Sequence, residues 1–295
     1  MKVEIKNRMK PCLIVSLAIM AIALVMTLTG NGLNLGVDFT GGTLMTYSMG
    51  GQFEVSDVEA ALAANGVTDA QIAKLGDNTE VQIRIKDQEN TDALRDALEK
   101  ALSEKYPDIH YVDISRVGAI AGRDLVSNAV KSVCIASLLM LVYIAIRFDF
   151  FMGLAAVLGL LHDVLVMLSF TVLLRGMIRV ETTYIAALLT IVGYSINNTI
   201  IIFDRIRENM RSGVNRSRGR VEVVNMSISQ SLSRTLNTTV TTLLTVVTLY
   251  VLGVDSIKQF ALPLIIGILA GTYSANMING YLWATFMDLR EKKKA

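Results

Sequence analysis

The chain has 295 residues, of which 52% are hydrophobic and 18% charged, and its mean hydropathy is +0.48. This composition is too apolar for an ordinary soluble enzyme, and a formal net charge of +2 provides no overall field for binding nucleic acid. Two cysteines and two histidines are too few for a disulfide scaffold or a Cys- or His-rich metal centre, so we expect neither a metal nor a cofactor. Sixteen of the 26 carboxylates lie between residues 38 and 124, which predicts a membrane protein with one water-exposed insert.

Six apolar segments are long enough to cross a bilayer, which takes about 20 helical residues. They are Leu13–Gly30, Val126–Ile146, Phe150–Leu174, Thr182–Phe203, Leu236–Leu252 and Phe260–Phe286. Basic residues precede the first segment, as in a signal peptide, but no small-residue cleavage pattern follows it. We therefore predict an uncleaved anchor and six transmembrane helices.

The basic residues on the short segments between the spans predict the orientation. Fifteen Lys and Arg lie on the side that holds both termini, and three lie on the other. Since the basic side faces the cytoplasm, we predict a multi-pass protein of the cytoplasmic membrane with both termini inside. The predicted parts are residues 1–31 (N-terminus and first helix), 32–125 (an extracytoplasmic domain), 126–287 (helices two to six) and 288–295 (a basic cytoplasmic tail).

The extracytoplasmic segment alternates between strand and helix patterns. Extended stretches are expected at Thr43–Met49, Gln71–Leu75, Val81–Ile85 and Ile109–Val117, with a turn at Gly76-Asp77-Asn78. A capping box that begins at Ser56 precedes the first helix, and Asn65-Gly66 ends that helix. A second helix starts at Asn90 or Thr91. The order βαββαβ predicts an α+β ferredoxin-like domain. His110 lies on a strand and is expected to be structural, and we predict no enzyme active site.

Polar side chains interrupt spans three to six, where each costs free energy and marks a candidate site. They are His162 and Asp163 in the third span, Asn197 and Asn198 in the fourth, Arg234 at the start of the fifth followed by Thr238, Thr241, Thr245 and Thr248 on one helical face, and Asn276 and Asn279 on one face of the sixth. Together they provide the inward polar groups that an ion or proton pathway requires.

Each of these groups also has a purely structural explanation. Asp163 and Arg234 would form a buried ion pair that fixes packing, or Arg234 would extend to the membrane surface. The threonine stripe suits close contacts between helices, as does Gly267-x-x-x-Gly271. His162 would then only hydrogen-bond a neighbour.

Several motifs carry a resemblance to a known family. Gly36-Val37-Asp38-Phe39-Thr40-Gly41-Gly42, directly after the first span, resembles the signature of the SecD/SecF family of protein-export subunits. Further blocks resemble its SecF branch: Leu161-His162-Asp163-Val164, Gly193 to Thr199 running into Phe203 to Asn209, Ser231-Leu232-Ser233-Arg234-Thr235 and Gly271-Thr272-Tyr273-Ser274. The resemblance covers essentially the whole chain.

The resemblance implies a member of the resistance-nodulation-division superfamily that works with SecD and the SecYEG channel, in a pathway that includes the SecA ATPase, and uses a proton or sodium gradient to promote preprotein export. Arg234 matches the family's functional arginine. Asn198 stands where many members carry Asp, and an amide does not titrate near neutral pH. Ion coupling would then rest on Asp163 or on SecD. The alternatives are a non-conducting scaffold of the translocase and a small-solute exporter.

Overall fold

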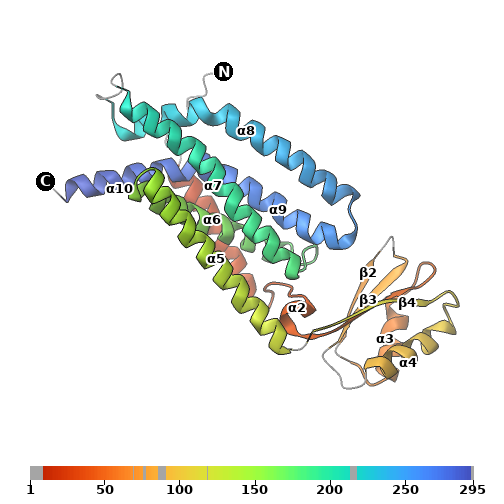
Figure 1. Cartoon of the computed structure of the whole chain (residues 1–295). Helices are drawn as coiled ribbons and strands as arrows, with labels where there is room; N and C mark the ends of the chain where they lie inside the picture. The colour runs from red at the N-terminus through yellow and green to blue at the C-terminus, as the bar shows by residue number, and fades with distance from the viewer. Residues whose placement is uncertain are drawn as a thin grey trace. The chain divides into compact units, whose positions relative to one another are not determined.

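The computed structural model describes residues 9–68, 70–75, 78–85, 91–117, 119–212 and 218–293 (Figure 1). The residues used in the sequence predictions that lie outside these ranges include Lys2, Lys6, Arg8, Gly76, Asp77, Asn90, Arg216 and Lys294. The chain divides into two compact units. One comprises Met1–Asn34 with Val130–Ala295, and the other comprises Leu35–Ala129.

Six helices in the described part of the chain are long and apolar enough to cross a membrane, as predicted. They are α1 (Met9–Leu28), α5 (Ala119–Arg147), α6 (Phe150–Leu173), α7 (Thr182–Arg211), α8 (Arg220–Leu252) and a sixth formed by α9 (Asp255–Ser274), η2 (Ala275–Asn279) and α10 (Gly280–Lys292). Helix α7 continues beyond the C-terminal end of its apolar run, and α8 begins well before the start of its own, because the polar residues there include good helix formers. Arg234 therefore lies inside α8 instead of at its start.

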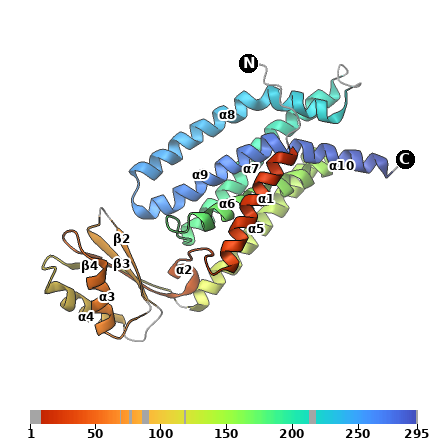
Figure 2. The ribbon, with the colours of Figure 1, turned by 180° about the vertical axis from the view of Figure 1, so that it is seen from behind.

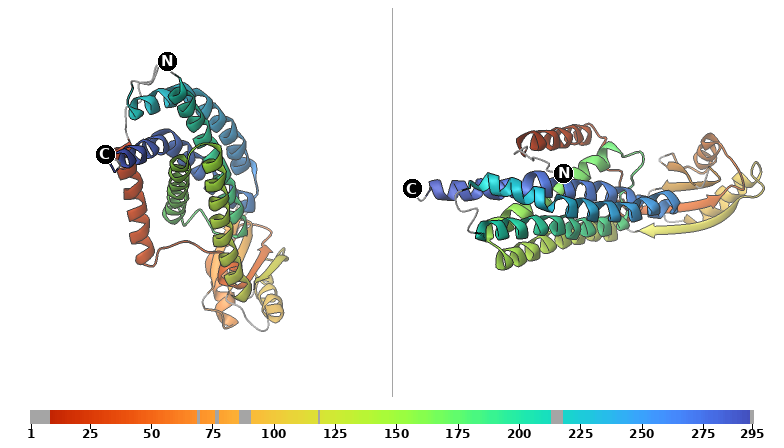
Figure 3. Two further views of the ribbon diagram at one scale, coloured as in Figure 1. Left: turned by 60° about the vertical axis from the view of Figure 1, so that its left-hand side comes forward. Right: turned by 90° about the horizontal axis from the view of Figure 1, so that it is seen from above.

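Helix α9 is the centre of the bundle and packs against α6, α7 and α8, while α1 packs against α6 (Figures 1 and 2). The expected close contact at the paired glycines is confirmed. A Cβ at Gly271 would lie 3.0 Å from Cβ of Ser195, and one at Gly267 would lie 2.0 Å from Cδ1 of Ile191. Small residues thus let the α7 and α9 backbones approach each other. In contrast, α1 lies at the margin of the bundle and leaves most of its apolar surface exposed (Figure 3).

The smaller unit contains a four-stranded antiparallel sheet of β1 (Gly42–Ser48), β2 (Gln71–Leu75), β3 (Glu80–Ile85) and β4 (His110–Val117), in the order β2-β3-β1-β4. Helices α3 (Val55–Ala64) and α4 (Thr91–Ser103) follow β1 and β3. Alternate residues of β1 and β3, such as Met45 and Ile83, pack with Leu62 and Leu98 of the helices in one fully buried core. This period-2 burial is what one covered face of a sheet requires.

Helix α3 departs from its predicted start. It begins at Val55 with Glu54 as N-cap, and no side chain caps it, so the capping box expected at Ser56 is wrong. Its predicted end at Asn65-Gly66 is confirmed, with Gly66 at φ +77°. Ser56 lies within the first turn because the N-cap, Glu54, is two residues further toward the N-terminus than the pattern indicated.

Candidate functional site

Asp163 lies in the middle of α6 and is fully buried among three helices. Its Oδ2 accepts hydrogen bonds from the hydroxyls of Ser195 on α7 (2.5 Å) and Ser274 on α9 (2.8 Å), and its Oδ1 lies 3.0 Å from Nδ1 of His162. Hydrogen bonds to a carboxylate are stronger than neutral ones and offset part of the cost of burying the charge. The bundle therefore holds one carboxyl group with three partners at membrane depth.

His162 connects this carboxyl group to the first span. Its Nε2 lies 2.8 Å from the hydroxyl oxygen of Ser16 on α1, and its ring stacks on Tyr273 of α9 with centroids 6.1 Å apart. Two helices thus hold the imidazole in one orientation between a hydroxyl and a carboxyl group.

The hydroxyl of Ser16 allows two arrangements of protons along the row Ser16–His162–Asp163. Its hydroxyl oxygen lies 2.8 Å from His162 Nε2 and 3.2 Å from the carbonyl oxygen of Cys12, but its single hydrogen serves only one of them. If Nε2 accepts that hydrogen, Nδ1 of His162 carries a proton and donates to Asp163. If Cys12 accepts it, Nε2 donates to Ser16, and Nδ1 then accepts from a protonated Asp163 or carries a second proton. The same heavy atoms therefore accommodate a proton on the imidazole or on the carboxyl group.

A second polar layer lies one turn away along the same helices. Asn279 donates from Nδ2 to the hydroxyl of Thr199 (2.8 Å), and its Oδ1 lies against Gly159, four residues before Asp163. Asn198 donates to the hydroxyl of Thr272 (3.3 Å). Both amides are buried, and among the described residues neither Oδ1 has a hydrogen-bond partner. These two oxygens are acceptors without a donor, which is typical of positions that hold water or a cation.

A π-helical turn, η2, explains how the sixth span serves both layers. Ser274 before the turn reaches Asp163, and Asn279 at its end lies against Gly159, although the two are five residues apart. In a regular α-helix, residues five apart point about 140° away from each other. The wider turn brings them onto one side, as π-turns often do at functional sites.

The π-turn also corrects the expectation that Asn276 and Asn279 share a face. Asn276 accepts a hydrogen bond from Thr235 of α8, whereas Asn279 contacts α6 and α7. Both are buried, but they face different helices.

The ion pair weighed for Asp163 and Arg234 is not formed. Asp163 is fully buried with His162, Ser195 and Ser274, and the side chain of Arg234 is exposed. Asn197 is also exposed. Thr238 is half-buried, while Thr241, Thr245 and Thr248 are exposed and donate to carbonyls of their own helix. The threonines of α8 that face the bundle are instead Thr235 and Thr239.

Sequence reasoning thus placed His162, Asp163 and Asn198 in the interior and missed their partners. Ser195 and Ser274 lie inside the SecF-like motifs quoted above. These motifs were therefore a sequence signal that both serines belong to the site. Ser16 is one of three hydroxyl-bearing residues in the first apolar run, and only the packing of α1 on α6 shows that it reaches His162.

The glycine-rich signature lies in the smaller unit and has a backbone explanation. Gly41 (φ +72°) and Gly42 (φ +127°) adopt conformations that strain any residue with a Cβ. They follow α2 (Val37–Thr40), a single turn that contains Asp38 and begins after the buried Gly36. A Cβ at Gly122 would lie 2.8 Å from the carbonyl oxygen of Phe39, so α2 rests on the backbone of α5.

Six apolar helices around a buried polar core define a multi-pass α-helical membrane protein. Residues 97–289 match the family described as "Protein export membrane protein SecD/SecF, C-terminal", and residues 27–50 match the "SecD/SecF GG Motif". The chain therefore belongs to the SecD/SecF family.

Individual relatives agree with this assignment. The chain is 32% identical over 294 residues to "Protein translocase subunit SecF" of Calditerrivibrio nitroreducens, covering 98% of this chain and 96% of that protein. It is 31% identical over 267 residues to SecDF of Bacillus subtilis, covering 89% of this chain and 35% of that protein. The crystal structure of SecDF from Thermus thermophilus, described as translocon-associated, is similar with a TM-score of 0.82 and 34% identity, covering 96% of this chain and 38% of that chain.

Proposed function

We propose that this chain is an accessory subunit of the Sec translocase that uses an ion gradient to promote preprotein export, with Asp163 as its titrating group. The observation that most directly supports this proposal is a fully buried carboxyl group, hydrogen-bonded to Ser195, Ser274 and His162. A buried ionisable group in a membrane span is costly and is usually retained for function. His162, which contacts both Asp163 and Ser16, provides a second position for the proton when Asp163 is ionised.

Replacing the carboxyl group tests this proposal. Asp163→Asn keeps the size of the side chain and removes its titration, so export stimulated by an imposed proton or sodium gradient should fall to the level without the subunit. Asp204→Asn, on the exposed part of α7, is the matched control and should export normally. Co-purification with SecD checks that assembly is intact. Normal gradient-stimulated export by Asp163→Asn would overturn the proposal.

A non-conducting scaffold is the second candidate, and the neutral layer around Asn198 favours it. Its contacts to Thr272, and from there to Thr239, are amide and hydroxyl bonds of the kind that hold helices together. Asn198→Asp separates the two functions. It adds a titratable group and should change the pH dependence of export if the bundle carries ions, and it should leave that dependence unchanged in a scaffold.

We infer that SecD covers the outer face of α8. An exposed arginine within a membrane-spanning helix is costly toward lipid. Relatives that carry SecD and SecF in one name, such as that of Bacillus subtilis, support SecD as the partner. With Cys12 and Cys134 replaced, Thr245→Cys should cross-link to SecD, and Leu139→Cys on exposed α5 should not. Equal cross-linking at both positions would contradict this interface.

We further propose that both termini are cytoplasmic, that residues 32–125 form an extracytoplasmic domain, and that this domain is ferredoxin-like. The strand order β2-β3-β1-β4 with helices after β1 and β3 supports the fold. SecYEG, SecA and the preprotein are the remaining proposed partners in the pathway, and we expect no catalytic activity and no cofactor.

A further inference from the structure

The first span contributes one buried polar side chain to the site around Asp163. Of the 20 residues of α1, all of which the structure describes, Ser16 and Ala23 alone are buried. Ser16 is 3% exposed, whereas its neighbours Val15 and Leu17 are 57% and 60% exposed. Burying a hydroxyl costs free energy unless it is hydrogen-bonded. The groups that the Ser16 hydroxyl contacts therefore explain its burial better than apolar packing does.

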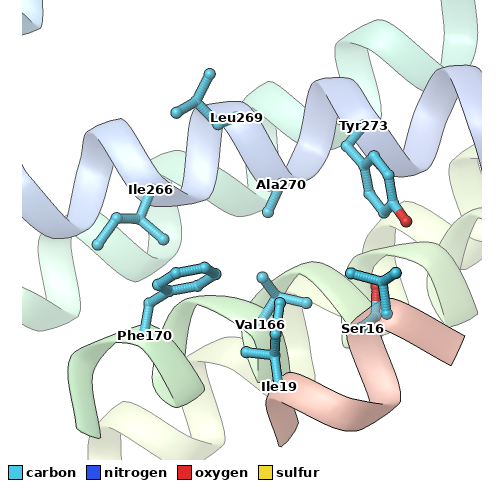
Figure 4. Close-up of a pocket in the computed structure, with 9 residues that line it drawn as sticks. Ser16, Ile19, Val166, Phe170, Ile266, Leu269, Ala270 and Tyr273 are labelled. Carbon is cyan, nitrogen blue, oxygen red and sulfur yellow. The ribbon is translucent and has the colours of Figure 1, made fainter. Parts of the chain in front are cut away.

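Three groups surround the hydroxyl of Ser16. Its oxygen lies 2.8 Å from Nε2 of His162 and 3.2 Å from the carbonyl oxygen of Cys12. The hydroxyl of Tyr273 points toward Ser16 from α9, and the other labelled side chains around them are apolar (Figure 4). Among the described residues, Nε2 of His162 has no hydrogen-bond partner other than Ser16.

The contacts of Asp163 show where an added proton is accommodated. Its Oδ2 already accepts hydrogen bonds from the hydroxyls of Ser195 and Ser274, and its Oδ1 faces Nδ1 of His162 at 3.0 Å. In the unloaded pair, Asp163 is ionised and Nδ1 donates its hydrogen to Oδ1. Adding one proton leaves one hydrogen between Oδ1 and Nδ1, on either atom, and places the other on Nε2.

The role of Ser16 therefore changes with the proton load of this pair. In the unloaded pair, Nε2 is an acceptor and the Ser16 hydroxyl donates to it. In the loaded pair, Nε2 donates to the Ser16 oxygen, and the Ser16 hydrogen turns to the carbonyl oxygen of Cys12. The pair gains one proton and the hydroxyl rotates, so the heavy atoms keep their positions.

We propose that Ser16 is a positioning residue for proton loading of the His162–Asp163 pair and that it stabilises the loaded pair more than the unloaded one. A hydrogen bond from a charged donor is about twice as strong as a neutral one, and the imidazole approaches a full charge only in the loaded pair. The contact of α1 with α6 thus regulates the proton affinity of a site on α6. This inference rests on the proposed titration of Asp163.

Few other groups compete for this role. Asp163 is the only charged side chain that contacts the imidazole among the described residues. The remaining titratable groups beside it are Tyr273 on α9, whose ring stacks on the imidazole, and Cys12 on α1, whose side chain lies against Tyr273. Both are retained in the variants below, so their contributions cancel in the comparison.

Nitrogen NMR with isotope-labelled histidine reports the protonation of Nε2 directly. The chain has two histidines, so His110→Gln leaves the signals of His162 alone. The labelled full chain is combined with unlabelled SecD in liposomes and titrated between about pH 4 and pH 10. Ser16→Thr and Ser16→Val form a matched pair, because the two side chains share one shape and only threonine has a hydroxyl. Thr27→Ala is the control, since Thr27 donates to a carbonyl of its own helix.

We expect Nε2 to gain its proton at the same pH in the wild type, Ser16→Thr and Thr27→Ala. In Ser16→Val the midpoint of this titration should be about one pH unit lower, which corresponds to tenfold weaker proton binding. Equal midpoints in Ser16→Val and Ser16→Thr, an equal shift in Thr27→Ala, or a wild-type Nε2 signal that does not change with pH would overturn the proposal.

The NMR result is independent of export, which separates this inference from the proposed function. If Asp163→Asn exports normally while Ser16→Val shows the expected shift, Ser16 still positions the proton, and only the use of that proton for export is excluded.

Discussion

At the scale of single residues, Asp163 is a fully buried carboxyl group, and its neighbours explain how it is accommodated. Each oxygen of the carboxyl group has a partner, and these partners come from α6, α7 and α9. Removing one partner of a buried charge leaves the other unsatisfied and destabilises a protein more than the pair stabilises it. Ser195 and Ser274 are therefore positioning residues for the carboxyl group.

Gly159 provides the space for Asn279, which gives a prediction at this scale. An added Cβ would lie 2.0 Å from Asn279 Oδ1, so Gly159→Ala displaces the amide and breaks its bond to Thr199. We expect this overpacking to lower the free energy of unfolding by about 1–3 kcal/mol. The measurement is a lower Tm in detergent solution. Gly193→Ala is the matched control, since nothing lies within 4 Å of its Cβ position. Gly193→Ala should leave the stability unchanged or raise the free energy of unfolding by about 0.5–1 kcal/mol. An equal change of Tm in both variants would contradict the packing argument.

At the scale of elements, η2 is the feature that gives the sixth span its role. By rotating α10 relative to α9, the π-turn lets one span contact Asp163 through Ser274 and Gly159 through Asn279. A regular helix would have turned one of these residues away from α6.

In the smaller unit, α3 is tied to the segment after α4 through Asp57. Its carboxylate accepts hydrogen bonds from Lys105 (2.7 Å) and Tyr106 (2.6 Å), and the Lys105 bond, with Tyr106 second, lowers the pKa of Asp57 below its usual value. A carboxyl group with a lowered folded-state pKa stabilises the fold above its unfolded-state pKa. That contribution is lost as the pH falls through the folded-state value.

This sign gives a pH prediction. Residues 35–122, expressed alone, should unfold cooperatively in urea, and their stability should fall between about pH 5 and pH 2. Asp57→Asn should remove part of that fall, and Glu59→Gln, exposed on the same helix, should keep it. An unchanged pH profile in Asp57→Asn would show that the ion pair does not contribute.

At the scale of the whole molecule, the asymmetry of basic residues predicts the orientation. With Cys12 and Cys134 replaced, Asp77→Cys should react with a membrane-impermeant maleimide in intact cells, because long external domains follow the orientation set by the short loops. Ser212→Cys, after the last turn of α7, should react only once the membrane is opened. Labelling of Ser212→Cys in intact cells would reverse the topology.

The sequence by itself determined the six spans, the α-helical membrane class, the order of strands and helices in residues 42–117 and the family. These follow from local properties: the length of an apolar run, the period of alternation and the spacing of short motifs. It also indicated that His162, Asp163 and Asn198 lie in the interior, because polar groups are rare in apolar spans.

Only the tertiary structure decided which groups meet. Asp163 faces Ser195 and Ser274 instead of Arg234, and Ser16 reaches His162 across 146 positions of the chain. A helical pattern fixes spacing along one face, but the rotation of each helix about its axis depends on how its small residues pack against neighbours. A π-turn changes that rotation with no mark in the apolar pattern. The partners of the buried carboxyl group are therefore a property of the assembled bundle.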